Sequence, residues 1–275
     1  MGGETRWGLG GESSAGTRTV RAPSGVESFD PAEMTVAVWA GTRLEELAAA
    51  LMESRQEVAL TGPSGSTVGG SLAVGWNSTR SLRVGAARDA LLQAECVGAG
   101  GMVFKAGGPT VKNVSGYELC RLLVGSLGTL GLIGRVILRT RPLPERSLWL
   151  SGNLSPVEVS RFCYRPSSIL WDGSSTHVCL EGYGTDVDAE ATVLRDHGML
   201  EIAGPPDLPP NRDRWTGVLP EGAILDVPLG VVHLGASVNP PDVDPGVRAI
   251  GERMKSNFDP DGRLNPGRDP YLVPA

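Results

Sequence analysis

Residues 112–131 read Lys112-Asn-Val-Ser-Gly-Tyr-Glu-Leu-Cys-Arg-Leu-Leu-Val-Gly-Ser-Leu-Gly-Thr-Leu-Gly131. Apolar residues at helical spacing predict a helix over 117–124, and the residues at 130–140 that follow are typical of a strand. Glycines at 125, 128 and 131 stand between the two. Because glycine lets a backbone come close to an anionic oxygen, a junction of this kind suits phosphate binding.

Two further segments, 1–10 and 61–76, also combine glycine with small polar residues. None of the three segments matches a named nucleotide motif. Gly62-Pro-Ser-Gly-Ser-Thr lacks the lysine of a P-loop, and the glycines of 125–131 are spaced GxxGxxG rather than GxGxxG. Taken singly, each segment is better explained by tight turns than by a ligand loop. Taken together, with residues 112–119 just ahead of the third segment, they favour phosphate binding.

The flanking sequence predicts a mixed α and β chain. Residues 34–40 alternate apolar and polar like a strand, and Thr42-Arg-Leu-Glu45 predicts a capping box that opens a helix over 43–54. A short strand at 58–60, a hairpin of 91–97 and 101–105, and a helix at 247–258 are also expected. Prolines at 142 and 144 suggest a boundary, which gives domains at 1–143 and 144–242 and a C-terminal helix and tail at 243–275.

Composition excludes several classes of protein. The chain has 275 residues, with 25 Lys and Arg against 31 Asp and Glu, and this acidic balance argues against a nucleic-acid partner. No apolar run reaches the roughly 18 residues of a transmembrane helix, and the first residues show no secretory apolar region. The four cysteines (Cys96, Cys120, Cys163 and Cys179) lack zinc spacing, so no metal site is expected, and they are interpreted as buried thiols of a reducing cytoplasm.

The segment 112–131 resembles a pattern of FAD-linked oxidases of the vanillyl-alcohol oxidase type, K-N-V-A-G-Y-D-L-x-R-L-x-V-G-S-L-G-T-L-G. Three other stretches agree with this family in order. Residues 1–10 resemble its first pyrophosphate loop, 65–73 resemble its second, G-A-T-x-G-G-x-L-A, and 258–267 resemble F-D-P-x-G-x-L-N-P-G. Within the family the chain is most similar to the E-type FAD-binding subunits of bacterial glycolate oxidase.

The resemblance implies an α+β fold: a PCMH-type FAD-binding domain of two β-containing subdomains, with a small α+β cap. In the family a βαβ unit precedes the first pyrophosphate loop. Met1 stands where that loop is already under way, so we expect a domain that is short at its N-terminus and lacks this unit.

The resemblance also implies which residues contact the cofactor. One side of the pyrophosphate would be held by Gly2, Gly3 and Thr5, and the other by Ser66, Thr67, Gly69 and Gly70. The flavin region would be lined by Gly116, Tyr117, Glu118, Gly131, Ile133 and Asn265. For Tyr117, packing under a loop is an equal alternative. No His or Cys occurs in 1–10 or 62–70, so FAD is expected to be non-covalent.

The implied function is that of an FAD-binding subunit of a 2-hydroxy-acid oxidase in the cytoplasm, peripheral to the membrane through partners. The partners would be a second flavin subunit and an iron–sulfur subunit, because this chain has no cysteine cluster. His177, His197 and His233 are isolated, and no catalytic residue is assigned. A non-catalytic assembly subunit with weak or lost FAD binding, and a nucleotide-binding module without a redox role, remain as alternatives.

Overall fold

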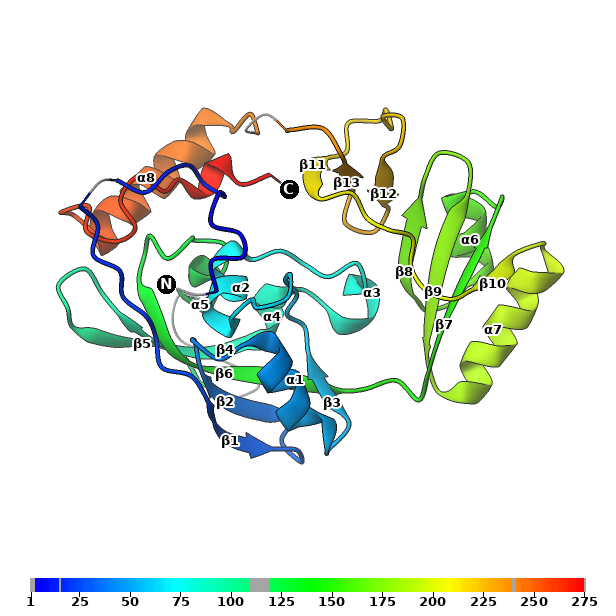
Figure 1. Ribbon diagram of the computed structural model, residues 1–275, viewed down its shortest axis with the longest axis horizontal. Helices are drawn as coiled ribbons and strands as arrows, with labels where there is room; N and C mark the ends of the chain where they lie inside the picture. The colour runs from blue at the N-terminus through cyan, green and yellow to red at the C-terminus, as the bar shows by residue number, and fades with distance from the viewer. Residues whose placement is uncertain (1–2, 15, 109–118, 239–240, 275) are drawn as a thin grey trace. The chain divides into compact units, whose positions relative to one another are not determined.

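The computed structural model describes residues 3–14, 16–108, 119–238 and 241–274 (Figure 1). The chain forms two compact units. Unit 1 contains residues 1–77, 86–142 and 240–273, and unit 2 contains 78–85, 143–239 and 274–275. Each unit is built around its own β-sheet.

Unit 1 consists of an antiparallel sheet and short helices. Its elements are β1 (Val26–Asp30), β2 (Thr35–Trp39), α1 (Leu44–Met52), β3 (Gln56–Val58), α2 (Val68–Val74), α4 (Ala87–Ala90), β4 (Leu91–Val97), β5 (Val103–Gly107), α5 (Leu119–Leu123), β6 (Leu132–Pro142), α8 (Pro245–Phe258) and the 3₁₀ turn η1 (Pro270–Leu272). The strand order is β1-β2-β6-β4-β5, and β3 pairs with the end of β6.

The core of unit 1 lies between this sheet and its helices. Val136 and Leu138 of the central strand β6 alternate with side chains that face the other way, as a strand covered on one face requires. They pack with residues of β2 and β4 and with apolar residues of α1, α2 and α5: Val36, Val38, Leu91, Ala94, Leu47, Leu51, Val68, Leu72 and Leu123. This core fixes the ends of the strands and helices from which the glycine-rich loops emerge.

The predicted strands of unit 1 are largely confirmed. The strand expected at 34–40 is β2, and the hairpin expected at 91–97 and 101–105 is β4 and β5, which pair antiparallel. The strand expected at 130–140 is β6, which begins and ends two residues later. The short strand predicted at 58–60 lies instead at Gln56–Val58, because these residues pair with the last three residues of β6.

The predicted capping box of α1 is wrong. Thr42 does not cap the helix: its hydroxyl accepts a hydrogen bond from the N–H of Gly25 (2.8 Å) and donates one to the carbonyl of Gly25 (3.2 Å). The helix begins one residue later, and the carboxylate of Glu46 accepts from the N–H of Arg43 (3.3 Å). Glu45 is therefore free to bond outside the helix.

The C-terminal helix is confirmed and starts at Pro245, two residues before the predicted 247. Asp244 accepts from the N–H groups of Gly246 (2.8 Å) and Val247 (3.2 Å), and proline suits the first helical turn. Of the helix predicted at 117–124, the described part is α5 at Leu119–Leu123, and residues 117–118 lie outside the described part of the chain.

Unit 2 is a seven-stranded antiparallel sheet with the order β10-β7-β9-β8-β12-β13-β11. Its elements are α3 (Ser81–Val84), β7 (Arg146–Gly152), α6 (Pro156–Phe162), β8 (Pro166–Trp171), β9 (Thr176–Gly182), α7 (Gly184–Asp196), β10 (Leu200–Ile202), β11 (Asn211–Arg214), β12 (Ile224–Asp226) and β13 (Val231–Leu234). Helices α6 and α7 pack on one face of the strands β7, β8 and β9 over an apolar core (Figure 1). The segment carrying α3 joins this unit through Arg80, whose Nε lies 2.9 Å from the carboxylate of Glu181.

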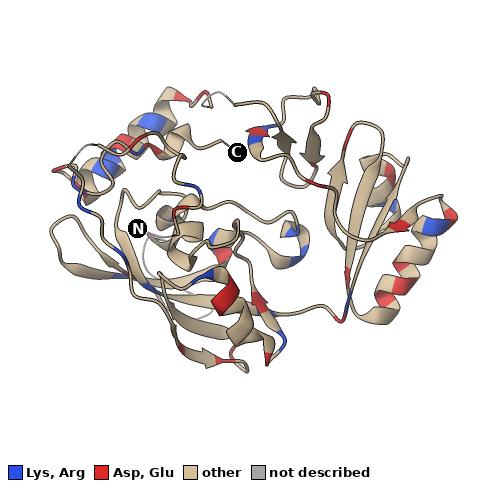
Figure 2. Cartoon of the chain, in the orientation of Figure 1, with Lys and Arg blue, Asp and Glu red and all other residues tan. Residues whose placement is uncertain are grey.

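The four cysteines are free and buried, as the sequence predicts. Figure 2 shows acidic and basic residues distributed along the elements of both units. Among the described residues, no helix combines the length and the hydropathy that crossing a bilayer would need.

Two adjacent leucines of α5 test the core of unit 1. Leu123 is 2% exposed and Leu122 is 38% exposed, and both lie in the same short helix. Leu123→Ala is expected to lower the free energy of unfolding by about 3 kcal/mol, because it leaves a cavity. Leu122→Ala is expected to lower it by less than about 1 kcal/mol. Urea unfolding followed by circular dichroism measures both, and equal losses would contradict the assigned packing.

Candidate functional site

The first two glycine-rich loops lie against each other in unit 1. A Cβ atom added at Gly3 would come 2.0 Å from the carbonyl oxygen of Gly65, so only glycine fits at this crossing. Next to it, the hydroxyls of Thr5 and Ser66 are 2.8 Å apart and share a hydrogen bond. The structure thus brings together residues 61 positions apart that the sequence assigned to opposite sides of one pyrophosphate.

Most backbone N–H groups of the second loop already have acceptors within the chain. The N–H of Gly65 donates to the carboxylate of Glu45 (2.8 Å), which lowers the pKa of that carboxyl below its ordinary value. The other pairs are Ser66 to the carbonyl of Pro63, Val68 to that of Thr42, Gly69 to that of Ala40 and Gly70 to the hydroxyl of Thr67. These bonds hold the loop rigid, and they leave hydroxyl groups rather than these N–H groups to bind an anion.

Three hydroxyls of the loop and the helix after it can serve as donors. The Thr67 oxygen caps α2 by accepting from Gly70, so its own O–H is still able to donate. One proton of the Thr5–Ser66 pair is likewise left over. The Ser71 hydroxyl is buried and has no hydrogen-bond partner within the described part of the chain. A Cβ at Gly62 would come 3.3 Å from it, so Ser71 lies directly beneath the loop.

Two arginines place positive charge beside this loop. Arg6 donates to the carbonyl of Thr61 (3.3 Å), and its guanidinium lies 4.4 Å from the centre of the Trp76 ring. A guanidinium nitrogen of Arg43 is 3.9 Å from the Cβ position of Gly65. Hydroxyl donors, close glycine backbone and flanking guanidinium groups together fit the pyrophosphate of a dinucleotide.

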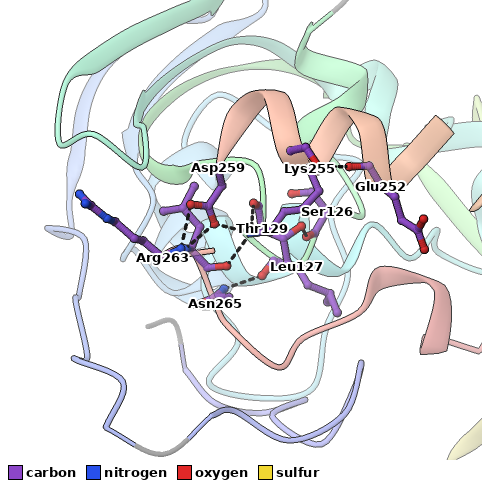
Figure 3. A network of polar contacts seen from close by, with 10 residues as sticks. Ser126, Leu127, Thr129, Glu252, Lys255, Asp259, Arg263 and Asn265 are labelled. Carbon is purple, nitrogen blue, oxygen red and sulfur yellow. Dashed lines mark hydrogen bonds and ion pairs between the residues drawn. The ribbon is translucent and has the colours of Figure 1, made fainter. Parts of the chain in front are cut away.

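A second cluster ties the C-terminal segment to the third glycine-rich loop (Figure 3). The ammonium group of Lys255 donates to the carbonyl of Thr129 (2.9 Å), the carbonyl of Leu264 (3.0 Å) and the carboxylate of Asp259 (2.5 Å). Asp259 is 2% exposed and also accepts from the N–H groups of Arg263 and Leu264. Lys255 therefore joins α8, the turn after it and the loop at 125–131 through one charged group.

The environment of Asp259 keeps it ionised. Burial raises the pKa of its carboxyl, but the hydrogen bond from Lys255 and the two backbone N–H bonds outweigh burial and bring the pKa below its ordinary value. The Asp259 carboxylate thus stays ionised at neutral pH, where it accepts from the ammonium group of Lys255.

Asn265 lies where two unusual backbone conformations meet. Asn265 (φ 43°) and Leu127 (φ 51°) both occupy the left-handed region, and the amide of Asn265 donates to the carbonyl of Leu127 (2.5 Å). A Cβ at Gly128 would come 2.8 Å from that amide nitrogen, so the position requires glycine. Asparagine tolerates this region better than most residues do, whereas leucine is rarely found there, so the strain lies mainly at Leu127. The role of Asn265 beside the flavin stays a prediction.

The C-terminal tail also holds the first loop. Asp269 donates its N–H to the carbonyl of Gly10 (2.8 Å), and the N–H of Ser14 donates to the carbonyl of Pro266 (2.9 Å). Arg268 donates to the carbonyl of Leu9 (2.8 Å), and its guanidinium lies 4.3 Å from the centre of the Trp7 ring. The loop at 3–14 is thus bonded to both the second loop and the tail.

Gly131 and Ile133 lie at the start of β6, against the hairpin β4–β5. A Cβ at Gly131 would come 3.0 Å from the Phe104 ring and 3.4 Å from the Cβ of Cys96. Ile133 is the register partner of Cys96 and is half-buried beside the core. Burial raises the pKa of the Cys96 thiol to about 12, so it stays neutral.

Four of the predicted cofactor residues, Gly2, Gly116, Tyr117 and Glu118, lie outside the described part of the chain. All three histidines lie in unit 2, where His177 contacts the carboxylate of Asp172 (3.1 Å) and His197 contacts the carbonyl of Val193 (2.8 Å). His233 is buried. Among the described residues, no group of three or more potential ligands is arranged for a metal ion.

Comparison with known proteins agrees with this site. The family model of the FAD binding domain matches residues 1–107. The match includes the first two loops, and it confirms FAD as the cofactor of this domain.

Glycolate oxidase subunit GlcE of Escherichia coli (strain K12) is 31% identical over 213 residues, which are 71% of this chain and 58% of that protein. Glycolate oxidase subunit GlcD of Bacillus subtilis (strain 168) is 41% identical over 80 residues, which are 29% of this chain and 17% of that protein. A solved structure of alkyldihydroxyacetonephosphate synthase matches 66% of this chain and 42% of its own, with a TM-score of 0.53 and 18% identity. With the two sheets of the structure, this likeness confirms the predicted α+β fold of the PCMH-type FAD-binding proteins.

Sequence reasoning missed Ser71, Lys255 and Asp259. Ser71 gave no signal, because only packing shows that its hydroxyl lacks a partner. Lys255 and Asp259 gave one: their i, i+4 spacing at the end of a predicted helix, in a chain with only three lysines, suggests a specific ion pair.

Lys255→Met tests the cluster. The variant leaves the buried Asp259 without its cation, so the free energy of unfolding is expected to fall by roughly 3 kcal/mol. Arg253→Met removes an exposed charge from the same helix and is expected to change it by less than about 0.5 kcal/mol. Urea unfolding of both variants makes the comparison. If the two variants were equally stable, the central role of Lys255 would be wrong.

Proposed function

We propose that the chain is the FAD-binding subunit of an oxidase or dehydrogenase that acts on a small 2-hydroxy acid of the glycolate type. The match of residues 1–107 to the FAD binding domain family and the likeness to two glycolate oxidase subunits support this proposal. Bound flavin supplies an acceptor for the hydride of the substrate. The protein supplies binding, orientation and electrostatics.

One observation carries the proposal: four segments distant in sequence meet in unit 1. They are the loops at 3–14, 62–71 and 125–131 and the tail at 258–269, joined by the Thr5–Ser66, Asn265–Leu127 and Lys255–Thr129 bonds. Each segment alone is explained by turns. Their convergence beside hydroxyl donors and arginines is what a dinucleotide site requires.

In this proposal each predicted residue keeps its side of the cofactor. The pyrophosphate lies between Gly2, Gly3 and Thr5 on one side and Ser66, Thr67, Gly69 and Gly70 on the other, and Ser71 adds a donor. The flavin region is lined by Gly116, Tyr117, Glu118, Gly131, Ile133 and Asn265. The FAD is non-covalent, because neither of the first two loops contains His or Cys.

The proposal also assigns the domains and the partners. Residues 1–143 form the FAD-binding domain, 144–242 form a small cap domain, and the C-terminal helix and tail at 243–275 return to the FAD-binding domain. Electrons leave through a second flavin subunit and an iron–sulfur subunit, because the four scattered cysteines of this chain cannot form a cluster site. Four free buried thiols favour a cytoplasmic location.

A second candidate function is a non-catalytic assembly subunit that holds FAD weakly. The specific observation in its favour is that the N–H groups of Gly65, Ser66, Val68, Gly69 and Gly70 are bonded within the chain. A cofactor would have to bind through side-chain hydroxyls or replace these bonds.

The absorbance spectrum of the purified protein, with and without added FAD, tests the proposal. We expect flavin bands that remain with the protein after gel filtration. Titration with ADP, which lacks the flavin ring, is expected to show weaker binding. A colourless protein that takes up no FAD would overturn the proposal. Weak uptake together with assembly into an oxidase complex would favour the assembly subunit.

Ser71→Ala separates a binding role from a structural one. The Ser71 hydroxyl lacks a partner within the described residues, so its loss is expected to leave the melting temperature unchanged or raised. FAD affinity is expected to fall about tenfold, the effect of one hydrogen bond of about 1.4 kcal/mol. Ser64→Ala in the exposed part of the same loop is the control, with near-normal affinity expected. Unchanged affinity in Ser71→Ala would remove Ser71 from the site.

A further inference from the structure

The N–H of Gly65 differs from the other bonded N–H groups of the second glycine-rich loop in the kind of acceptor that it uses. Those groups donate to backbone carbonyls or, at Gly70, to the hydroxyl of the residue that caps α2. Gly65 donates instead to the side-chain carboxylate of Glu45, which lies 20 positions earlier in the first turn of α1 (2.8 Å). One N–H of the loop is therefore bonded to an anion that belongs to the chain itself.

The bond between Glu45 and Gly65 is able to open without any change in the backbone. Glu45 and the neighbouring Ser64 are exposed and Gly65 is half-buried, so solvent and dissolved anions reach this contact. A glutamate side chain leaves its partner by rotating about its own single bonds. A backbone carbonyl, such as that of Ala40 which accepts from Gly69, moves only if the chain around it moves. The bond to Glu45 is therefore easier to replace than the bonds to carbonyls.

The Glu45 carboxylate carries a negative charge at neutral pH. Hydrogen bonds from the N–H of Gly65 and from its own backbone lower the pKa of this carboxyl, and Ser64 and Arg43 lower it further. A charged oxygen is a stronger acceptor than a neutral one. Glu45 therefore holds the N–H of Gly65 until another anion replaces it.

This charge lies at the edge of the proposed pyrophosphate site. The Cβ position of Gly65 is 3.7 Å from Cγ2 of Thr5 and 3.9 Å from a guanidinium nitrogen of Arg43. The hydroxyl of Thr5 bonds to that of Ser66, the residue that follows Gly65. A pyrophosphate held between Thr5 and Ser66 would thus meet the Glu45 carboxylate as a neighbouring like charge.

We propose that Glu45 is an internal competitor of FAD: its carboxylate holds the N–H of Gly65 in the chain without cofactor, and a pyrophosphate oxygen takes that N–H when FAD binds. The identity of the second anion rests on the proposed function, whereas the exchangeable bond rests on the contact between Glu45 and Gly65. The exchange adds one N–H to the hydroxyls and arginines that face the phosphates. Because the carboxylate must first be displaced, Glu45 lowers the affinity for FAD.

Titration calorimetry of the full chain with FAD tests this role in two variants of Glu45. Glu45→Gln removes the charge and keeps an oxygen that can accept from Gly65, whereas Glu45→Ala removes both. Both variants are expected to bind FAD at least about threefold more tightly than wild type, the effect of losing one exposed charge interaction. Equal or weaker binding in both variants would make Glu45 a support of the loop and would overturn the proposal.

Glu53→Gln is the matched control for these variants. Glu53 is exposed at the other end of α1, so this change removes the same charge from the same helix. Its affinity for FAD is expected to stay within about twofold of wild type, because solvent and salt screen a distant exposed charge. A gain equal to that of Glu45→Gln would reflect net charge alone and would contradict the proposal.

The amide NMR signal of Gly65 reports the exchange of acceptors directly. Without FAD, this signal is expected to differ between wild type and Glu45→Ala, because only wild type has the carboxylate as acceptor. With saturating FAD, the two signals are expected to coincide, because a phosphate oxygen is then the acceptor in both proteins. Signals that still differ with FAD bound would show that Glu45 keeps its bond to Gly65, which the proposal forbids.

The two proposals fail separately. FAD binding that is equal in wild type and in the Glu45 variants contradicts only the role of Glu45. An absence of FAD binding in wild type and in both variants contradicts the proposed function, and the competitor role with it. Binding by Glu45→Ala but not by wild type supports both proposals, because removal of the competitor then opens the site.

Discussion

The proposed FAD site of unit 1 depends on the ammonium group of Lys255. It holds the carbonyl of Thr129 in the third glycine-rich loop and the carbonyl of Leu264 in the tail, and it neutralises the buried Asp259. Asn265 follows Leu264 directly, so its bond to Leu127 is set by this arrangement. The tail beyond Asn265 then carries the bonds that hold the first loop. One lysine thus organises three segments separated by more than 100 residues.

The second loop combines rigidity with a reduced set of donors. Its N–H groups bond to Glu45, Pro63, Thr42, Ala40 and Thr67, which fixes the backbone before any ligand arrives. A fixed loop lowers the entropy lost on binding. Because these N–H groups are already bonded, we propose that the phosphates are held by the hydroxyls of Thr67 and Ser71 and by Arg6 and Arg43. The strength of FAD binding therefore decides between the redox subunit and the assembly subunit.

The sequence predicts the strands and helices that are determined by the hydrophobic pattern of neighbouring residues. The alternation at 34–40, the hairpin at 91–105 and the amphipathic helix at 247–258 are found close to their predicted bounds. The predicted capping box is wrong because the Thr42 hydroxyl bonds to the backbone of Gly25 instead. Gly25 lies 17 residues away in sequence, so no local pattern predicts this bond.

The candidate site divides in the same way. Motif resemblance identifies Thr5, Ser66 and Asn265, which the structure places in the converging loops, because glycine-rich loops carry a sequence signature. Ser71 has no such signature. That its hydroxyl is buried without a hydrogen-bond partner among the described residues follows from packing, which only the folded chain defines.

Hydrogen exchange measured by mass spectrometry, with and without FAD, tests the central claim most directly. If four segments form one FAD site, FAD should slow exchange in peptides covering 3–14, 62–75, 125–131 and 258–269 together, and should leave β7, β9 and α7 unchanged. Protection confined to residues 144–238, or protection of the second loop without the tail at 258–269, would contradict the account.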